Sequence, residues 1–123
     1  MNGDGGRYPR RGEIWWTRFP TDPPGKGRRP VIVVSVDSRN CHPRADTVLV
    51  VPLSTSIQKA GPTQLLLKAG ETGLREDSLV RAESICTVRR GDLSDVVEGG
   101  RKMSNTQICH LAGLVRLAMG CLD

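Results

Sequence analysis

The chain lacks long apolar runs, paired cysteines and more than a few aromatic residues, and each shortage excludes a class of protein. Its longest apolar runs are only a few residues, so we expect no membrane span and no signal peptide, and a cytoplasmic location. The four cysteines form no Cys-x-x-Cys pair and show no zinc-ligand spacing. We therefore expect neither zinc nor a disulfide framework, and interpret the cysteines as reduced, mostly buried thiols.

The length and the charge distribution favour a single domain with one basic region. We interpret residues 1–11, rich in glycine and without periodicity, as a flexible N-terminal tail, and residues 12–123 as one domain. The formal net charge is +5. Residues 1–44 carry nine Lys or Arg against four Asp or Glu, whereas residues 45–123 carry nine of each. The excess positive charge near the N-terminus favours a polyanionic partner.

The apolar pattern predicts a mostly β fold with a C-terminal helix. Residues 13–19 hold three of the four aromatic residues and have strand composition. Residues 31–36 and 47–53 are nearly continuous apolar runs, typical of strands buried on both faces. Residues 63–68 and 79–88 predict two further strands, and residues 69–73 a loop. Ser104 and Gln107 form a capping box that begins a helix, and its apolar face is expected to pack on the sheet.

A loop rich in proline and glycine precedes the first buried strand and carries Lys26, Arg28 and Arg29. Pro30 fits the first position of that strand, so Arg29 is expected on a rigid edge. A guanidinium fixed in this way suits a phosphate oxygen. An arginine pair before a strand is also common on a merely solubilising surface. Hydroxyl residues, Ser54 and Thr55, end the second buried strand.

Strand alternation places Arg81 and Glu83 about 7 Å apart on one face of the strand predicted for residues 79–88. Taken alone, this pair reads as an ion pair on an exposed face. The remaining chemistry is limited: Asp92 and Asp95 have no partner cluster for a metal-dependent nuclease. A mechanism based on two histidines has only His42 and His110. Of the nucleic-acid reactions considered, this leaves RNA cleavage without a metal, for which an arginine, a hydroxyl and a carboxylate suffice.

Six short motifs follow one another along the chain: Arg11-Gly12-Glu13-Ile14-Trp15, Arg28-Arg29-Pro30 followed by a valine-rich strand and Ser35, Val51-Pro52-Leu53-Ser54, Gly61-Pro62-Thr63, Asp77-Ser78 and Glu83-Ser84-Ile85-Cys86-Thr87-Val88. Their order and spacing resemble the MazF/PemK family of toxin endoribonucleases. The chain departs from the usual pattern at Ser84 and Cys86, where the family commonly has Gln and Arg. Its loop before Arg28 is similar to that of the short-loop branch.

The resemblance implies a small SH3-like barrel of the MazF/PemK/CcdB type, usually a homodimer. Because the sequence shows no carboxylate or Cys/His cluster, we expect no metal and no cofactor. The resemblance also implies a type II toxin that cleaves single-stranded RNA with a sequence preference and is held in check by a cognate antitoxin. Arg29 and Ser54, or the acid and base pair Arg81 and Glu83, would be catalytic. Lys26, Arg28, Thr55 and Asp77 would contact RNA. A gyrase-poisoning toxin of the same fold and a non-catalytic RNA-binding module are the alternatives.

Overall fold

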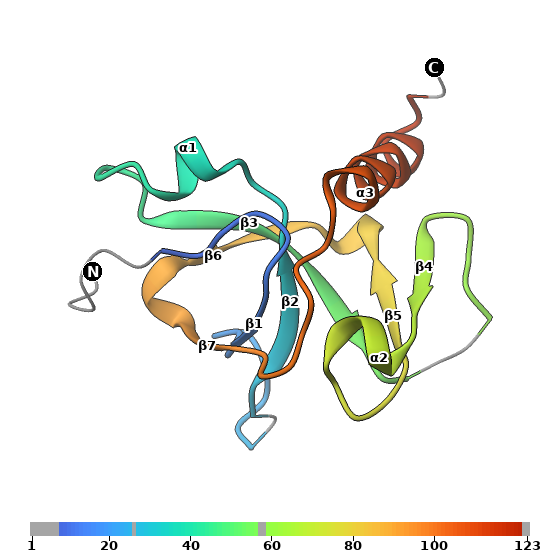
Figure 1. Ribbon diagram of the computed structural model, residues 1–123, viewed down its shortest axis with the longest axis horizontal. Helices are drawn as coiled ribbons and strands as arrows, with labels where there is room; N and C mark the ends of the chain where they lie inside the picture. Colours follow the sequence, from blue (N-terminus) through green and yellow to red (C-terminus); the bar gives the residue numbers. More distant parts are fainter. Residues whose placement is uncertain (1–7, 26, 57–58, 122–123) are drawn as a thin grey trace.

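The computed structural model describes residues 8–25, 27–56 and 59–121. Their elements, in chain order, are β1 (Ile14–Thr17), β2 (Arg29–Val33), α1 (Asp37–Asn40), β3 (Thr47–Ser54), β4 (Gln64–Leu67), α2 (Ala69–Thr72), β5 (Ser78–Arg81), η1 (Ala82–Ser84), β6 (Cys86–Arg89), η2 (Arg90–Asp92), β7 (Leu93–Val96) and α3 (Asn105–Ala118). The predicted mostly β fold with a C-terminal helix is confirmed (Figure 1).

The strands form one twisted antiparallel sheet in the order β4-β5-β3-β2-β1-β7, and β6 pairs with β3 outside this path. Within the described residues, β4 and β7 lie at opposite ends of this order, so the pairing does not close into a barrel. Strand β3 is the centre of the arrangement because it pairs with β2 on one side and with both β5 and β6 on the other. The hairpin between β1 and β2 projects from the sheet (Figure 1).

The central strands are buried on both faces, as their apolar runs predict. Val31, Ile32 and Val33 of β2 have no exposed surface, because a core cluster lies on each side of the sheet. One cluster includes Ile32, Val51, Leu53 and Val80 together with Ile108 and Leu111 of α3. The other contains Trp15, Val31, Val33, Val48, Val50, Val88 and Leu93. The sheet ends are thereby fixed on a packed core.

Helix α3 begins as its sequence predicts. The Ser104 hydroxyl accepts a hydrogen bond from the Gln107 N–H, and the Gln107 side chain accepts one from the Ser104 N–H, which completes the capping box. The helix packs beside η1 and the end of β5 (Figure 1). Of the predicted apolar face only Ile108 and Leu111 are buried, whereas Ala112, Ala118 and Met119 are exposed.

Several local predictions were wrong. The segment 79–88 is two strands separated by the 3-10 turn η1, and residues 69–72 form the helical turn α2 where a loop was expected. Cys41, Cys109 and Cys121 are exposed and Cys86 is half-buried, so most cysteines are not core residues. Burial raises the pKa of the Cys86 thiol. No helix in the described ranges has the length and apolar character needed to span a membrane.

A glycine contact brings together two loops that lie far apart in the sequence. Gly73 ends α2 with φ +81°, and a Cβ there would collide with the backbone of Gly99 and Gly100. Only glycine permits both this conformation and this approach. The loop after α2 and the loop after β7 are therefore held side by side, next to the β1–β2 hairpin.

Candidate functional site

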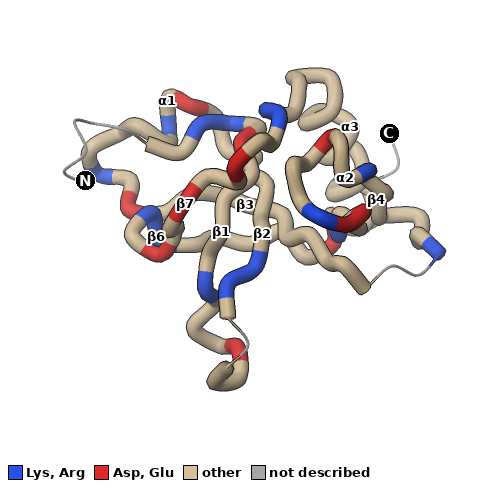
Figure 2. The backbone as a smooth tube through the Cα atoms, turned by 60° about the horizontal axis from the view of Figure 1, so that its bottom comes forward, with Lys and Arg blue, Asp and Glu red and all other residues tan. Residues whose placement is uncertain are grey.

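The arginines of the hairpin lie where the sequence predicts, at the start of β2. Arg29 is the first residue of β2 and pairs with Thr17 of β1, while Pro30 pairs with Trp16. Thr17 is fully buried, and its hydroxyl donates a hydrogen bond of 2.9 Å to the Asp92 carbonyl. Figure 2 shows basic residues on both arms of the hairpin and an acidic residue in its loop. The backbone of Arg29 is thus held by a neighbouring buried strand.

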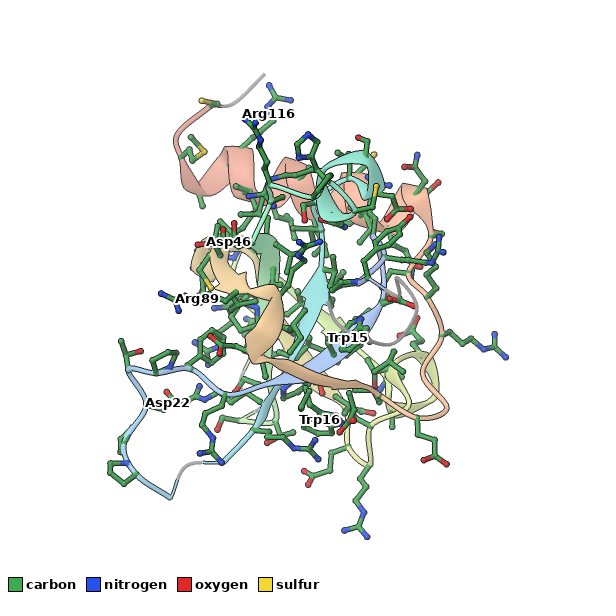
Figure 3. The ribbon with its side chains drawn as sticks, turned by 90° about the vertical axis from the view of Figure 1, so that its left-hand side faces the viewer. Trp15, Trp16, Asp22, Asp46, Arg89 and Arg116 are labelled. Carbon is green, nitrogen blue, oxygen red and sulfur yellow. The ribbon has the colours of Figure 1, made fainter. Side chains whose placement is uncertain are left out.

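Arg29 is paired with an acid from its own loop. Its Nε lies 2.9 Å from Asp22 Oδ2, in an ion pair whose geometry is not that of a hydrogen bond. The Asp22 side chain is 15 % exposed and the Arg29 side chain 38 % exposed. Asp22 lies on the loop that projects from the sheet (Figure 3). The guanidinium therefore has an anionic partner in the free protein while part of it faces solvent.

Arg28 is held by contacts across the neighbouring strands. Its Nη1 donates to Asp95 Oδ2 at 2.6 Å and to Ser94 Oγ at 3.1 Å, both on β7. Its guanidinium carbon lies 5.4 Å from the centre of the Trp16 ring. The two arginines of the loop thus carry separate carboxylate partners, Asp95 for Arg28 and Asp22 for Arg29.

An open cavity of about 580 Å³ lies at this end of the sheet. It brings together the hairpin, the end of β3 and the two loops joined at Gly73 and Gly100. Its lining residues are Trp16, Arg28, Arg29, Pro30, Leu53, Ser54, Thr55, Ser56, Gly73, Leu74, Arg75, Glu76, Val97 and Glu98. Four of the predicted site residues, Arg28, Arg29, Ser54 and Thr55, are therefore in one place.

Ser54 is oriented by the turn that follows β3. Its Oγ accepts a hydrogen bond of 3.1 Å from the Ser56 N–H, so its hydroxyl hydrogen can be donated elsewhere. The register of β2 and β3 pairs Val31 with Pro52, and two residues further along the same register Arg29 falls opposite Ser54. The following residue, Thr55, is exposed. Ser54 has the more defined position of the two hydroxyl residues.

Arg81 and Glu83 do not share a strand face, contrary to the prediction. Strand β5 ends at Arg81, and Glu83 lies in η1. The Glu83 carboxylate accepts hydrogen bonds of 2.9 Å from Thr63 Oγ1 and from Gln64 Nε2. Neither residue lines the cavity.

The pKa of Glu83 reflects these partners. Partial burial raises it, but hydrogen bonds from Gln64, from the Glu83 backbone and from Thr63, together with the positive charge of Arg81, lower it more, so the pKa lies below the usual 4.5. Glu83 is therefore a carboxylate at neutral pH.

The other two predicted RNA contacts are placed differently. Asp77 accepts a hydrogen bond of 3.0 Å from the Ala69 N–H and lies 3.5 Å from Lys68 Nζ, so it supports the start of α2 and does not line the cavity. Lys26 lies outside the described residues. Within the described ranges no group of three His, Cys, Asp or Glu side chains is arranged to hold a metal ion.

The sequence prediction missed Trp16, Arg75, Glu76 and Glu98 in this cavity. Trp16 carried a signal, since it is an aromatic residue on the strand that precedes the basic loop. The other three carried none, because they reach the cavity only through the contact between Gly73 and Gly100.

A family model and individual relatives of known function match this chain, and they agree on one protein family. The model of the PemK-like, MazF-like toxins of type II toxin-antitoxin systems matches residues 10–112. Endoribonuclease MazF9 of Mycobacterium tuberculosis is 37 % identical over 86 residues, which cover 64 % of this chain and 71 % of that protein. Endoribonuclease MazF6 of the same species is 34 % identical over 89 residues, which cover 71 % of this chain and 78 % of that protein.

Solved structures show the same fold. MazF from Deinococcus radiodurans superposes with a TM-score of 0.71 at 19 % identity and covers 93 % of this chain and 98 % of its own. A mycobacterial endoribonuclease, solved in complex with its cognate antitoxin, has a TM-score of 0.68 at 23 % identity and covers 91 % of this chain and 95 % of its own. At these sequence identities, the structural similarity supports the fold alone.

Proposed function

Since this chain belongs to the PemK-like, MazF-like toxins of type II toxin-antitoxin systems, we propose that it is an endoribonuclease that cleaves single-stranded RNA without a metal ion. It cleaves with a sequence preference and is neutralised by a cognate antitoxin. The observation that carries this proposal is the cavity that unites the preorganised guanidinium of Arg29 with the hydroxyl of Ser54. The cytoplasm, where messenger RNA is translated, is its proposed location.

The proposed reaction needs three things from the protein: removal of the 2′-hydroxyl proton, stabilisation of the charge on the phosphate, and protonation of the leaving 5′-oxygen. The RNA 2′-hydroxyl attacks the adjacent phosphorus, its proton is removed, and the 5′-oxygen leaves with a proton, so that a 2′,3′-cyclic phosphate forms. Negative charge grows on the phosphate oxygens in the transition state, where a fixed guanidinium is most effective. Arg29 supplies that guanidinium when a phosphate oxygen replaces Asp22. Ser54 donates its hydroxyl hydrogen to the same phosphate.

Arg81 and Glu83 are the proposed acid and base, and we expect them to contribute less to the rate enhancement than Arg29. Both lie outside the cavity: Arg81 is two residues beyond Leu79, the β5 partner of Ser54, and Glu83 follows it in η1. Glu83 is ionised as a base must be, but its lowered pKa makes it a weak one. Most of the catalysis is therefore assigned to electrostatic stabilisation by Arg29.

The proposed partners follow from the same surfaces. Arg28, Thr55 and Lys26 are proposed RNA contacts beside the catalytic pair. A second copy of this chain and an acidic antitoxin segment are the proposed protein partners, and the antitoxin competes with RNA for the basic hairpin. The relatives named above are endoribonucleases, and one was solved with its antitoxin, which supports cleavage over gyrase poisoning or RNA binding alone.

The experiment that tests this proposal compares two substrates of one sequence. Purified protein is incubated with a long single-stranded RNA and with the corresponding DNA, and fragments are mapped by primer extension. We expect cuts at a small set of RNA positions and intact DNA, because only RNA carries the attacking 2′-hydroxyl. Intact RNA together with inhibited gyrase supercoiling would replace this function by the gyrase alternative. RNA that is bound but stays intact would favour the alternative of a non-catalytic RNA-binding module.

A further inference from the structure

Trp16 lines the cavity from a rigid position on β1, and no role in catalysis accounts for it. On β1 it is paired with Pro30 of β2 on one side and with Asp95 of β7 on the other. Its ring packs against the core cluster beneath and also lines the cavity. Figure 3 shows Trp16 lower on β1 than the buried Trp15, toward the hairpin loop. The indole ring thus lies at the cavity, beside the phosphate-binding arginine.

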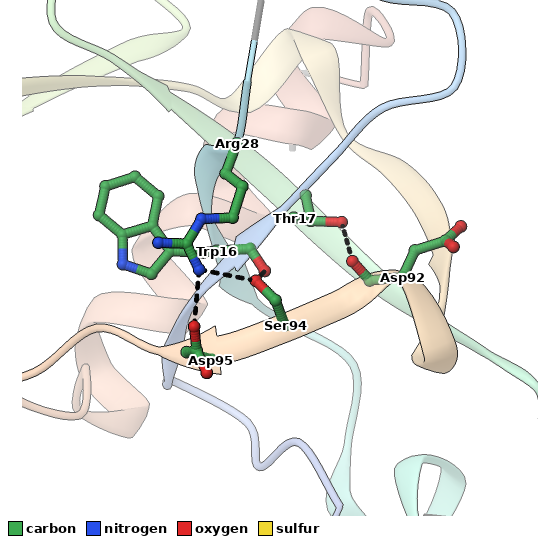
Figure 4. A network of polar contacts seen from close by, with 6 residues as sticks. All are labelled: Trp16, Thr17, Arg28, Asp92, Ser94 and Asp95. Carbon is green, nitrogen blue, oxygen red and sulfur yellow. Dashed lines mark hydrogen bonds and ion pairs between the residues drawn. The ribbon is translucent and has the colours of Figure 1, made fainter.

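In the free protein one face of this ring is covered by Arg28 (Figure 4). The guanidinium stands over the indole ring while its Nη1 contacts Asp95 and Ser94. Both members of the ion pair are at the surface, with side chains 46 % and 66 % exposed, so the pair is weak and exchangeable. A guanidinium is planar like a nucleobase, and a carboxylate offers it the same paired acceptors as a phosphate.

The cavity beside this face has the composition that a nucleotide requires. Its apolar lining residues are Trp16, Pro30, Leu53, Leu74 and Val97, and its charged lining residues are three arginines, Arg28, Arg29 and Arg75, and two acids, Glu76 and Glu98. Its volume of about 580 Å³ lies within the usual range for small-ligand sites, roughly 300–1,000 Å³. An apolar surface for a base thus adjoins a cationic surface for its phosphate.

We propose that Trp16 is the stacking surface for one nucleobase of the RNA, and that Arg28 covers it until RNA binds. When RNA enters, Arg28 exchanges the Asp95 carboxylate for an RNA phosphate, and the base takes the place of the guanidinium on the indole. Trp16 is then a substrate-positioning residue, and Asp95 a competitor of the RNA. This inference rests on the proposed function, because it takes RNA as the ligand of this cavity.

The test uses tryptophan fluorescence and a single-stranded RNA whose 2′-hydroxyls are all O-methylated, so that it binds without being cleaved. In Trp15→Phe the only tryptophan is Trp16, and we expect RNA to quench its emission. In Trp16→Phe the only tryptophan is the buried Trp15, and we expect no quenching. Circular dichroism confirms that both variants fold.

Affinity for the same RNA gives a second readout. Trp16→Leu should bind about 5- to 150-fold more weakly, the range for the loss of one stacked base, whereas Trp16→Phe should retain most of the affinity. Asp95→Asn should bind several-fold more tightly because Arg28 is released. Glu98→Gln is the matched control, since it removes the same charge from the cavity rim but breaks no ion pair found among the described residues.

The outcomes separate this inference from the function on which it rests. Unchanged Trp16 emission with near wild-type binding by Trp16→Leu, in a protein that cleaves unmodified RNA, overturns the stacking role alone. Equal gains in RNA affinity from Asp95→Asn and Glu98→Gln overturn the proposed exchange of Arg28 from Asp95 to an RNA phosphate. Absence of any cleavage by the wild-type protein overturns the proposed function first.

Discussion

Replacement of Arg29 by alanine is the perturbation for which the structure gives the most definite expectation. The backbone of Arg29 is fixed by pairing with the buried Thr17, so its guanidinium is presented to a phosphate at little further ordering cost. Removing a preorganised donor to a developing oxyanion typically lowers turnover on the order of 100-fold or more. That loss corresponds to about 2.7 kcal/mol of transition-state stabilisation.

The same substitution also leaves Asp22 without its partner. Because Asp22 is 15 % exposed but Arg29 is 38 % exposed, solvent screens the pair, and the stability cost is about 1 kcal/mol. For a domain of this size that cost lowers Tm by roughly 3–6 °C. The double variant Asp22→Asn, Arg29→Ala removes the unpaired charge, so it should regain the lost Tm without regaining turnover.

The assay is single-turnover RNA cleavage at saturating protein, with circular dichroism to confirm folding. Arg29→Lys should recover only part of the rate, since an ammonium lacks the paired donors of a guanidinium. Lys26 is predicted from the sequence to contact RNA. The Lys26→Ala variant should therefore keep its turnover, while its RNA binding becomes weaker and less dependent on salt. Near wild-type cleavage by a folded Arg29→Ala variant would refute the reasoning and shift the chemistry to Arg81 and Glu83.

Three further substitutions test other parts of the structure. Ser54→Ala should reduce single-turnover cleavage at least 10-fold, whereas Thr55→Ala should reduce it less than 3-fold, because the Ser54 hydroxyl is oriented by the Ser56 N–H and Thr55 is exposed; equal losses would contradict this. Glu83→Gln should lower Tm slightly at pH 7, and the difference should vanish as the pH falls below about 4.5, since a lowered carboxyl pKa stabilises the fold above that pH; a pH-independent difference in thermal melts would oppose it. Leu111→Ala, at a fully buried helix position, should cost about 2–5 kcal/mol in urea unfolding, and a loss below 1 kcal/mol would show that α3 does not share the core.

The sequence predicted those elements whose determinants are local. The apolar runs of β2 and β3 identified strands buried on both faces, and the capping box placed the start of α3 at Ser104. Pro30 predicted the start of β2 to within one residue, since the strand begins at Arg29. Ser54 followed from the end of β3. These signals are short-range, so one sequence contains them in full.

The break between β5 and β6 could not be predicted because its cause is a long-range pairing. Strand β3 pairs Leu53 with Val80, and a continuous partner strand would bring Glu83 opposite Val50. Cys86 is found there, so the register shifts by three residues and η1 takes up the extra length. Strand propensity is similar on both sides of this break. The alternation argument for Arg81 and Glu83 failed for that reason.

The most direct measurement of the central claim is cleavage of a long single-stranded RNA in excess EDTA, with the new 3′ ends identified by mass spectrometry. If Arg29 and Ser54 stabilise the attack of the 2′-hydroxyl, cleavage persists at an undiminished rate, the 3′ ends carry 2′,3′-cyclic phosphate, and Arg29→Ala loses both. Activity that returns only on addition of a divalent cation, or products with 3′-hydroxyl ends, would contradict the account.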